Sequence, residues 1–390
     1  MNILEEIRNC PVEWKELGEV CSVKKGKQLN KNLLTEDGLY PAYNGGQTYS
    51  GRTNDYNVEA NTIIVSQGGA SAGFVNFVDT KFWANAHCYY ILPDETRVNN
   101  RFVYHFVKMN QKYLMDFQHG AGIPALKADK LSKLLLPIPP LEIQEKIVQT
   151  LDKFTDYVTE LTSELTSRKK QYSYYRDKLL SFEDEVYQVE WKKLGEVGKV
   201  SMCKRILKNQ TSDDGEIPFY KIGTFGKVAT SYISRELFEE YKLRFSYPKL
   251  GDILISASGT IGRTVVFNGE DSYFQDSNIV WLEHDESQVL NRYLYYFYQM
   301  NPWKVSDGGT ISRLYNGNIE KTTIPVPSLE IQSRIIQVLD NFDTVCNDLN
   351  IGLPKEIELR QKQYEYFRDK LLTFVAEGEY TDSTVQTRHH

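Results

Sequence analysis

The chain contains the same plan twice, and this repeat limits its possible folds more than any other feature of the sequence. Three pairs of segments match in the same order: VEWKELGEV at 12–20 with VEWKKLGEV at 189–197, PIPPLEIQEKIVQTLDKF at 137–154 with PVPSLEIQSRIIQVLDNF at 325–342, and RKKQYSYYRDKLLSF at 168–182 with RQKQYEYFRDKLLTF at 360–374. The offset grows from 177 residues between Val12 and Val189 to 192 residues between Arg168 and Arg360, so the second copy carries insertions. We therefore interpret the chain as a tandem duplication of one unit of roughly 185 residues.

Each copy ends in a long segment with helical periodicity. From Ile147 to Leu179 the seam residues recur at alternating spacings of four and three, the a/d pattern of a coiled coil. At 1.5 Å per residue the helix that begins at Leu141 would be roughly 60 Å long. The second copy carries a four-residue insertion in this pattern, and the adjacent Gly352 and Pro354 predict a break. The stripe of a and d residues on one helix must be buried against another surface, so we expect the two helices to pair. A single amphipathic helix packed on a globular domain is the alternative.

Two variable blocks, roughly 21–136 and 198–324, precede the helices. They contain short β-like runs separated by Gly, Asn and Asp turns, at Asn61–Ser66, Cys88–Leu92 and Asp252–Ser256, with helices expected near Asn99–Phe117 and Leu290–Lys304. The predicted fold class is α+β or α/β, with two globular domains separated by two long antiparallel coiled-coil helices in a pseudo-twofold repeat. The predicted boundaries are 1–136 and 183–324 for the domains, 137–182 and 325–375 for the helices, and 376–390 for a C-terminal tail.

Composition and charge exclude several classes of protein. With 41% apolar and 25% charged residues the chain is typical of a globular protein rather than a disordered one. No apolar stretch approaches the roughly 18 residues that span a bilayer. Five cysteines without a CxxC pair, and an acidic start without a secretory signal, favour a cytoplasmic location. The net charge of −6 excludes a uniformly basic nucleic-acid binder but leaves room for a local basic surface.

The two blocks hold most of the candidate nucleic-acid contacts. Residues 21–136 have 13 basic and 9 acidic side chains, and residues 198–324 have 15 of each, so the acidic excess lies elsewhere. Lys and Arg contact phosphates, whereas Arg, Asn, Gln, Ser and Thr can read base edges. A solvated charged face is the alternative for any one cluster. The candidate DNA-binding residues are Lys25, Lys27, Gln28, Asn44, Gln47, Arg52, Gln67, Lys204, Arg205, Lys221, Thr224, Lys227, Arg263, Ser312 and Arg313.

The sequence offers no catalytic constellation. Gly68–Gly73 is glycine-rich, but no GK[ST] follows, so it is not a P-loop. Asn301–Trp303 lacks the second proline of the [ND]PP[FYW] element of adenine methyltransferases and is interpreted as a helix stop.

Other charged or histidine-containing motifs also have a structural interpretation. Glu13–Lys15 and Glu190–Lys192 resemble half of a nuclease site, yet they lie in the duplicated framework, and we expect Trp14 and Trp191 to pack at a domain junction. His87 and Cys88 are an adjacent pair rather than a metal-ligand cluster. We expect no metal site, and His105 is interpreted as a partly buried structural residue on a helix.

The duplicated motifs W-K-x-L-G-E-V, P-[IV]-P-x-L-E-I-Q and R-D-K-L-L, in this order, resemble the specificity subunit of type I restriction–modification systems. The resemblance covers nearly the whole chain. It implies that each globular domain is a target recognition domain that reads one half of a bipartite double-stranded DNA site. Because the polar loops of the two blocks differ, we expect the half-sites to differ as well.

The resemblance further implies that the helices dock two methyltransferase subunits, which carry S-adenosylmethionine and methylate adenine, and that a translocating restriction subunit can join them. No cofactor is expected on this chain itself. Residues kept identical in both copies would offer one partner-binding surface twice; ion pairs on the helix surface are the alternative. These residues are Gln171, Arg176, Asp177 and Lys178 in the first copy and Gln363, Arg368, Asp369 and Lys370 in the second.

Glu160–Ser167 reads ELTSELTS, a tandem tetrapeptide absent from the second copy. The family carries a similar repeat whose number tunes the spacing of the half-sites, and four helical residues add about 6 Å. Two accidental turns of a coiled coil are the alternative.

Two other functions compete with a non-catalytic DNA-recognition subunit. One is a coiled-coil scaffold whose α/β domains bind protein rather than DNA. The other is a nuclease or methyltransferase with cryptic motifs.

Overall fold

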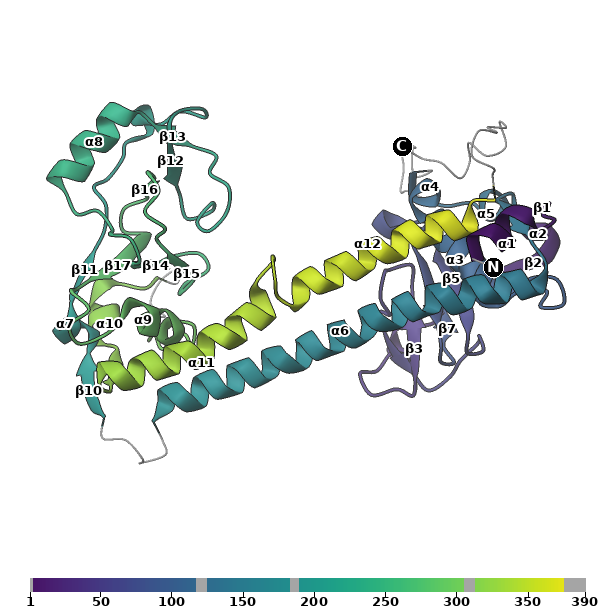
Figure 1. The fold of residues 1–390 in the computed structure, drawn as a ribbon, viewed down its shortest axis with the longest axis horizontal. Helices are drawn as coiled ribbons and strands as arrows, with labels where there is room; N and C mark the ends of the chain where they lie inside the picture. The colour runs from purple at the N-terminus through teal and green to yellow at the C-terminus, as the bar shows by residue number, and fades with distance from the viewer. Residues whose placement is uncertain (1–2, 117–124, 183–188, 305–312, 375–390) are drawn as a thin grey trace. The chain divides into compact units, whose positions relative to one another are not determined.

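The computed structural model describes residues 3–116, 125–182, 189–304 and 313–374 (Figure 1). The chain divides into two compact units, one made of residues 1–162 and 356–390 and the other of residues 163–355. Each unit therefore combines one globular domain with helical segments from both copies of the repeat.

The first globular domain contains helices α1 (Ile3–Asn9), α2 (Leu17–Val20), α3 (Asn100–Met109), α4 (Gln111–Asp116) and α5 (Ala128–Ser132), and strands β1 (Glu13–Glu16), β2 (Cys21–Lys25), β3 (Tyr40–Tyr43), β4 (Gly51–Thr53), β5 (Thr62–Ser66), β6 (Val75–Val78), β7 (Trp83–Ala84), β8 (Cys88–Pro93) and β9 (Leu135–Ile138). Its main sheet is antiparallel, in the order β2-β8-β5-β6, and all residues of β5 are buried. A second sheet has the order β4-β3-β7, and β1 pairs with β9. The side chain of Asn99 accepts hydrogen bonds from the backbone N–H groups of Arg101 and Phe102, and so starts α3.

The second globular domain contains helices α7 (Leu194–Val197), α8 (Arg235–Arg244), α9 (Asn291–Tyr298) and α10 (Asn316–Lys321), and strands β10 (Glu190–Lys193), β11 (Lys199–Ser201), β12 (Ile217–Tyr220), β13 (Tyr232–Ile233), β14 (Ile253–Ser256), β15 (Thr264–Val266), β16 (Tyr273–Phe274), β17 (Ile279–Glu283) and β18 (Thr323–Val326). The sheet orders repeat those of the first domain: β11-β17-β14-β15, β13-β12-β16 and β10-β18. Helix α8 lies between β13 and β14, where residues 54–61 of the first domain form no helix. The duplication predicted from the sequence is thus confirmed at the level of strand order.

Several details differ from the sequence-based expectation. The sheets are antiparallel apart from the β3–β7 and β12–β16 pairs, so the domains are α+β, one of the two predicted fold classes. The expected helix near Asn99–Phe117 is two helices, α3 and α4, and its counterpart ends earlier, at Tyr298. Trp14 is half-buried, but Trp191 is 54% exposed, so the expected packing is wrong for Trp191. It lies on the outward face of the two-stranded β10–β18 sheet, where nothing covers it among the described residues.

Three helices form the connecting coil: α6 (Leu141–Ser181), α11 (Leu329–Asn347) and α12 (Leu353–Leu372). In the first unit the ring of Phe154 on α6 stacks on Phe367 of α12, with ring centroids 5.1 Å apart. In the second unit Phe342 of α11 stacks on Tyr175 of α6 at 5.7 Å. Since early residues of one copy contact late residues of the other in both units, the helices pair antiparallel, as the seam predicts.

The second helical segment is interrupted where the sequence predicts it. Helix α11 ends at Asn347 and α12 begins at Leu353. The Asp348 carboxylate accepts hydrogen bonds from the backbone N–H groups of Asn350 and Ile351 and so holds the turn together. A Cβ at Gly352 would lie 2.5 Å from the carbonyl oxygen of Thr344, so this tight turn requires glycine.

Among the described residues, no helix is both long and apolar enough to cross a membrane.

Candidate nucleic-acid interface

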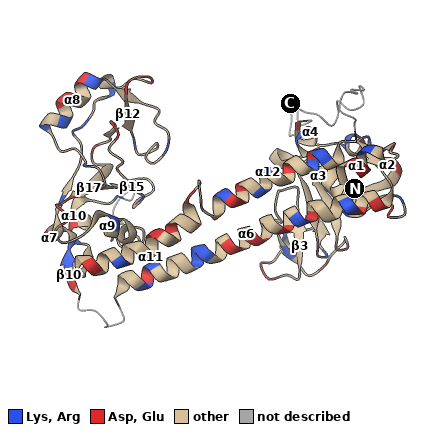
Figure 2. Ribbon diagram, in the orientation of Figure 1, with Lys and Arg blue, Asp and Glu red and all other residues tan. Residues whose placement is uncertain are grey.

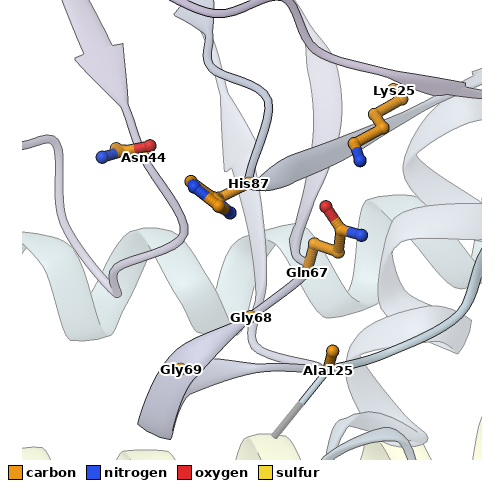
Figure 3. A pocket seen from close by; sticks show the side chains of 7 residues that line it. All are labelled: Lys25, Asn44, Gln67, Gly68, Gly69, His87 and Ala125. Atoms are coloured by element: carbon orange, nitrogen blue, oxygen red, sulfur yellow. The ribbon is translucent and has the colours of Figure 1, made fainter. Parts of the chain in front are cut away.

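The first domain has a hollow at the edge of its main sheet. Its volume is about 460 Å³. It is lined by Lys25, Asn44, Gln67, Gly68, Gly69, His87 and Ala125, which Figure 3 shows arranged around the same space. Lys25 ends β2, Gln67 follows β5 and His87 precedes β8 of the main sheet, and Asn44 follows β3 of the second sheet, so the strand ends bring together segments far apart in the sequence. Three of the sequence-predicted residues, Lys25, Asn44 and Gln67, thus share one site.

Backbone hydrogen bonds hold the walls of the hollow. The Gln67 N–H donates to the carbonyl of His87 at 2.8 Å, and the Leu126 N–H donates to the carbonyl of Gln67 at 2.7 Å. Gly69 has a positive φ of 76°, and a Cβ built there meets nothing within 4 Å. This part of the floor is therefore bare backbone that a ligand can approach closely.

His87 belongs to this site although the sequence did not single it out as a DNA contact. It is exposed, whereas the adjacent Cys88, the first residue of β8, is buried. Burial raises the pKa of the Cys88 thiol to about 11, which keeps this group a neutral part of the core. The signal that could have found His87 is its place one residue before a buried strand, on the side of the sheet that carries Gln67.

The side chains of Lys25, Asn44 and His87 are exposed, and within the described ranges no hydrogen bond occupies them. They present an ammonium group, an amide and an imidazole to solvent around a backbone floor. This combination provides donors for phosphate and base oxygens and an amide that both donates and accepts.

The remaining candidates of the first domain lie on surrounding loops. Lys27, Gln28 and Gln47 are exposed. Arg52 differs, because its half-buried guanidinium donates to the carbonyls of Gly38 and Leu39 and so braces that loop.

In the second domain the candidates follow the same strand ends. Lys204 and Arg205 are exposed after β11, and the Lys204 ammonium lies 5.1 Å from the centre of the Phe245 ring. Lys221 follows β12 and donates from Nζ to the Ser231 hydroxyl at 2.8 Å.

Several of the other second-domain candidates form hydrogen bonds that stabilise their own loops. The Thr224 hydroxyl accepts from the backbone N–H of Lys221, and Lys227 is exposed beyond that turn. The Arg263 guanidinium donates to the carbonyl of Phe225 at 3.0 Å. Arg313 donates to the carbonyl of Ser277 at 2.7 Å. Ser312 lies outside the described residues.

The candidate partner surface has the same local geometry in both copies. Arg176 pairs with Asp177 at 2.7 Å, and Arg368 pairs with Asp369 at 2.7 Å. Each arginine also lies over a buried tyrosine, Tyr172 or Tyr364, at 5.8 and 5.7 Å from the ring centre.

The ion pairs foreseen as the alternative for this surface are therefore present. They leave the two aspartates more than half exposed, at 55% and 59%. Gln171, Lys178, Gln363 and Lys370 are exposed beside them. Figure 2 shows basic and acidic residues interspersed along α6, α11 and α12.

A buried polar cluster joins the first domain to its helices. His105 on α3 is fully buried; its Nε2 lies 2.7 Å from Asp152 Oδ1 on α6, and its Nδ1 lies 3.0 Å from the Tyr364 hydroxyl on α12. Arg101 also pairs with Asp152, at 2.5 Å. His105 is thus a structural residue, as expected, although it is completely rather than partly buried.

The same cluster fixes the charge states of its members. Burial lowers the pKa of His105, against the opposing effect of the Asp152 carboxylate, so the imidazole is neutral. Burial acts to raise the pKa of Asp152, but hydrogen bonds from His105 and Arg101 outweigh it and hold this pKa below its usual value.

The second unit repeats the cluster with different chemistry. Arg292 on α9 pairs with Asp340 on α11 at 2.7 Å, in the place of Arg101 and Asp152. Tyr296 stands where the first unit has His105, and its hydroxyl donates to Asp340. Both domains are therefore anchored on the coil through an arginine–aspartate pair.

Among the residues that the structure describes, no three His, Cys, Asp or Glu side chains gather in a way that could hold a metal ion.

Comparison with known proteins identifies the family model that fits this chain. The model described as "Type I restriction modification DNA specificity domain" matches twice, over residues 11–168 and 188–359. The two matches cover most of the chain and coincide with the two copies of the repeat.

Full-length relatives carry the same description. A Haemophilus influenzae protein named as a type I restriction enzyme specificity subunit is 49% identical over 376 residues, covering 93% of this chain and 96% of its own length. The EcoR124I/EcoR124II specificity subunit of Escherichia coli is 30% identical over 405 residues, covering 96% and 97%. The crystal structure of a type I restriction–modification S subunit from Mycoplasma genitalium has a TM-score of 0.60 at 21% identity, over 94% of this chain and 98% of that one, and so shares the fold.

Proposed function

Since the chain belongs to the family of type I restriction–modification DNA specificity subunits, with two target recognition domains, we propose that it reads a bipartite, asymmetric DNA site, one half-site with each domain. It does so without performing chemistry itself. We propose that it functions in the cytoplasm.

The observation that carries the proposal is that one domain architecture occurs twice with unlike polar side chains at matching loop positions. Lys25, Asn44 and Gln67 surround the hollow of the first domain, whereas the corresponding loops of the second domain present Lys221 and Arg313. Two copies of one domain fold that carry different loop side chains suit the recognition of two different base sequences. Two-domain readers of duplex DNA use half-sites in the same manner.

The helices support the partner side of the proposal. The Arg176–Asp177 pair recurs as Arg368–Asp369 with the same 2.7 Å contact and the same tyrosine beneath the arginine. Two equal surfaces suit two copies of one partner. We propose that two methyltransferase subunits dock there and bring S-adenosylmethionine for adenine methylation, and that restriction subunits join this assembly.

Methylome sequencing of cells that express this chain with its methyltransferase subunit tests the proposal. The expected result is methylated adenine within one motif that has two unlike half-sites and a fixed spacer. Binding of the purified complex to that motif should weaken steeply with salt, because each phosphate contact releases counterions.

A coiled-coil scaffold that binds protein is the competing function. It predicts no motif in the methylome and no salt-dependent DNA binding, even with the methyltransferase present. That combined outcome would overturn the proposed function.

A further inference from the structure

We propose that the residues at five structurally equivalent positions of the two domains determine which bases the two half-sites contain. The proposal rests on the DNA-reading function above and adds which residues carry the specificity. In the first domain the positions hold Lys25, Asn44, Gln67, His87 and Ala125, all of which line the hollow. In the second domain they hold Met202, Lys221, Ala257, Asn278 and Arg313. Ala257 is buried in the core, so base contact at this site falls to the other positions.

Matched backbone hydrogen bonds establish this equivalence. In the first domain they run from Gln67 N to His87 O at 2.8 Å, from Leu126 N to Gln67 O at 2.7 Å and from Asn85 N to Tyr43 O at 2.9 Å. In the second domain they run from Ala257 N to Asn278 O at 2.7 Å, from Leu314 N to Ala257 O at 2.9 Å and from Gln275 N to Tyr220 O at 2.9 Å. The backbone around the site is therefore the same frame, built twice.

Strand register fixes the remaining position. Val23 lies opposite Ile91 in the first domain, and Val200 lies opposite Leu282 in the second. Two residues after these valines come Lys25 and Met202.

Both frames also keep bare backbone in the same place. Gly69 and Gly259 each have a positive φ, of 76° and 65°. A Cβ would meet nothing within 4 Å at Gly69 and only a side-chain carbon of Ile222, at 3.5 Å, at Gly259. The positive φ accounts for glycine at both positions, and the open space beside them leaves the backbone accessible from outside.

The side chains at these equivalent positions differ between the two domains, as recognition of two different base sequences requires. Asn44 is replaced by Lys221, Gln67 by Ala257, and His87 by Asn278. Residues that only supported the fold would be expected to stay similar, as Ser66 and Ser256 do one residue before Gln67 and Ala257.

The chemistry of each set indicates a base. In the first domain Asn44 and Gln67 supply two amides, and an amide can both accept from N6 and donate to N7 of adenine in the major groove. We therefore assign an A·T pair to these side chains.

In the second domain Arg313 supplies the fork of donors that fits O6 and N7 of guanine. One of its N–H groups is used on the carbonyl of Ser277, which orients the guanidinium and leaves other donors. The first domain has Ala125 in this place and cannot make that contact.

Substitution at Arg313, followed by methylome sequencing of the complex with the methyltransferase, tests the inference. Arg313→Ala should reduce the preference for guanine at a single position of one half-site, by roughly 5- to 150-fold, and leave the other half-site unchanged. Asn44→Ala combined with Gln67→Ala should relax one A·T position in the other half-site only.

Control variants separate base reading from loss of charge or folding. Arg313→Lys keeps the charge but not the fork, so guanine preference should still fall while the salt dependence of binding stays the same. Arg244→Ala removes an exposed arginine of α8 that pairs with Glu240, and Asn32→Ala removes an exposed amide outside the hollow; both should leave the motif unchanged.

The outcomes are distinguishable. An unaltered motif in Arg313→Ala and in the amide double variant, with wild-type methylation, overturns this inference but not the proposed function. If the wild-type complex methylates no motif at all, it is the proposed function that fails.

Discussion

Removing the hydroxyl group of Tyr364 should make local opening of the first unit easier, because one buried hydrogen bond is lost. Asp152 is ionised and can only accept, so His105 donates to it from Nε2. The neutral imidazole then has an acceptor at Nδ1, and the Tyr364 hydroxyl, 3.0 Å away, is the donor that satisfies it. In Tyr364→Phe this nitrogen stays buried without a partner.

The magnitude follows from that unsatisfied group. A buried acceptor that loses its donor costs about 1–3 kcal/mol. His105 is completely buried and Tyr364 is 5% exposed, so water does not readily replace the lost hydroxyl. The cost falls on the contact between α3 and α12, both within the first unit.

Hydrogen exchange measured by mass spectrometry locates this loss. Backbone amides of α3 and α12 should exchange roughly 5- to 150-fold faster in Tyr364→Phe than in the wild type, since local opening becomes easier by that factor. The second unit should keep its protection.

The neighbouring Tyr366 provides a matched control, because it is 59% exposed. Tyr366→Phe should change exchange little, as surface substitutions usually do. Equal exchange rates in the two variants would refute the role assigned to the His105 hydrogen bond.

Four further predictions follow from other features. Burial lowers the pKa of His105, so the unfolded chain binds more protons than the folded chain near pH 6. The free energy of unfolding should therefore decrease as the pH falls below about 6.5. Urea titrations from pH 8 to 5 should show a steeper dependence of this free energy on pH in the wild type than in His105→Asn. Deleting one tetrapeptide of residues 160–167 removes about 6 Å from the continuous helix α6 and should shorten the methylome spacer by one or two base pairs, with both half-sites retained; an unchanged spacer would contradict the role of this repeat. Gly352→Ala places a Cβ 2.5 Å from a backbone carbonyl oxygen and should lower the midpoint of thermal unfolding, whereas an unchanged midpoint would show that the turn can relax. Asp177→Arg and Asp369→Arg should each lower the number of methyltransferase subunits bound from two to one in native mass spectrometry, and retention of both subunits would place docking elsewhere.

The helical part of the fold was predictable because its information is local. A seam repeated over many turns determines a helix and the face that it buries, and Gly352 with Pro354 marks the break that separates α11 from α12. The order of the duplicated segments also predicted two globular domains, each followed by a long helical segment. Helix α8 was not predicted. The choice between α+β and α/β stayed open, because strand pairing depends on contacts between residues far apart in the sequence.

In the candidate site, too, the types of residue were predictable from the sequence but their spatial arrangement was not. Residue type alone placed Lys25, Asn44 and Gln67 among the DNA contacts, but only the folded sheet shows that they share one hollow. His87 was considered only as a metal ligand beside Cys88, because sequence cannot tell which spatial neighbours an exposed side chain will have. Arg52 was selected for its charge, whereas its fold-specific contacts are with loop carbonyls.

The way the helices are shared has a consequence for a chain with only one copy of the repeat. The first unit is completed by residues 356–374, which come from the second copy, and the second unit is completed by residues 163–182 from the first. A polypeptide with only one copy would carry a closing segment, but that segment completes the other unit, so its own unit would need the closing segment of an identical neighbour. Each unit is thus built from both copies, as it would be if two one-copy chains exchanged their closing segments.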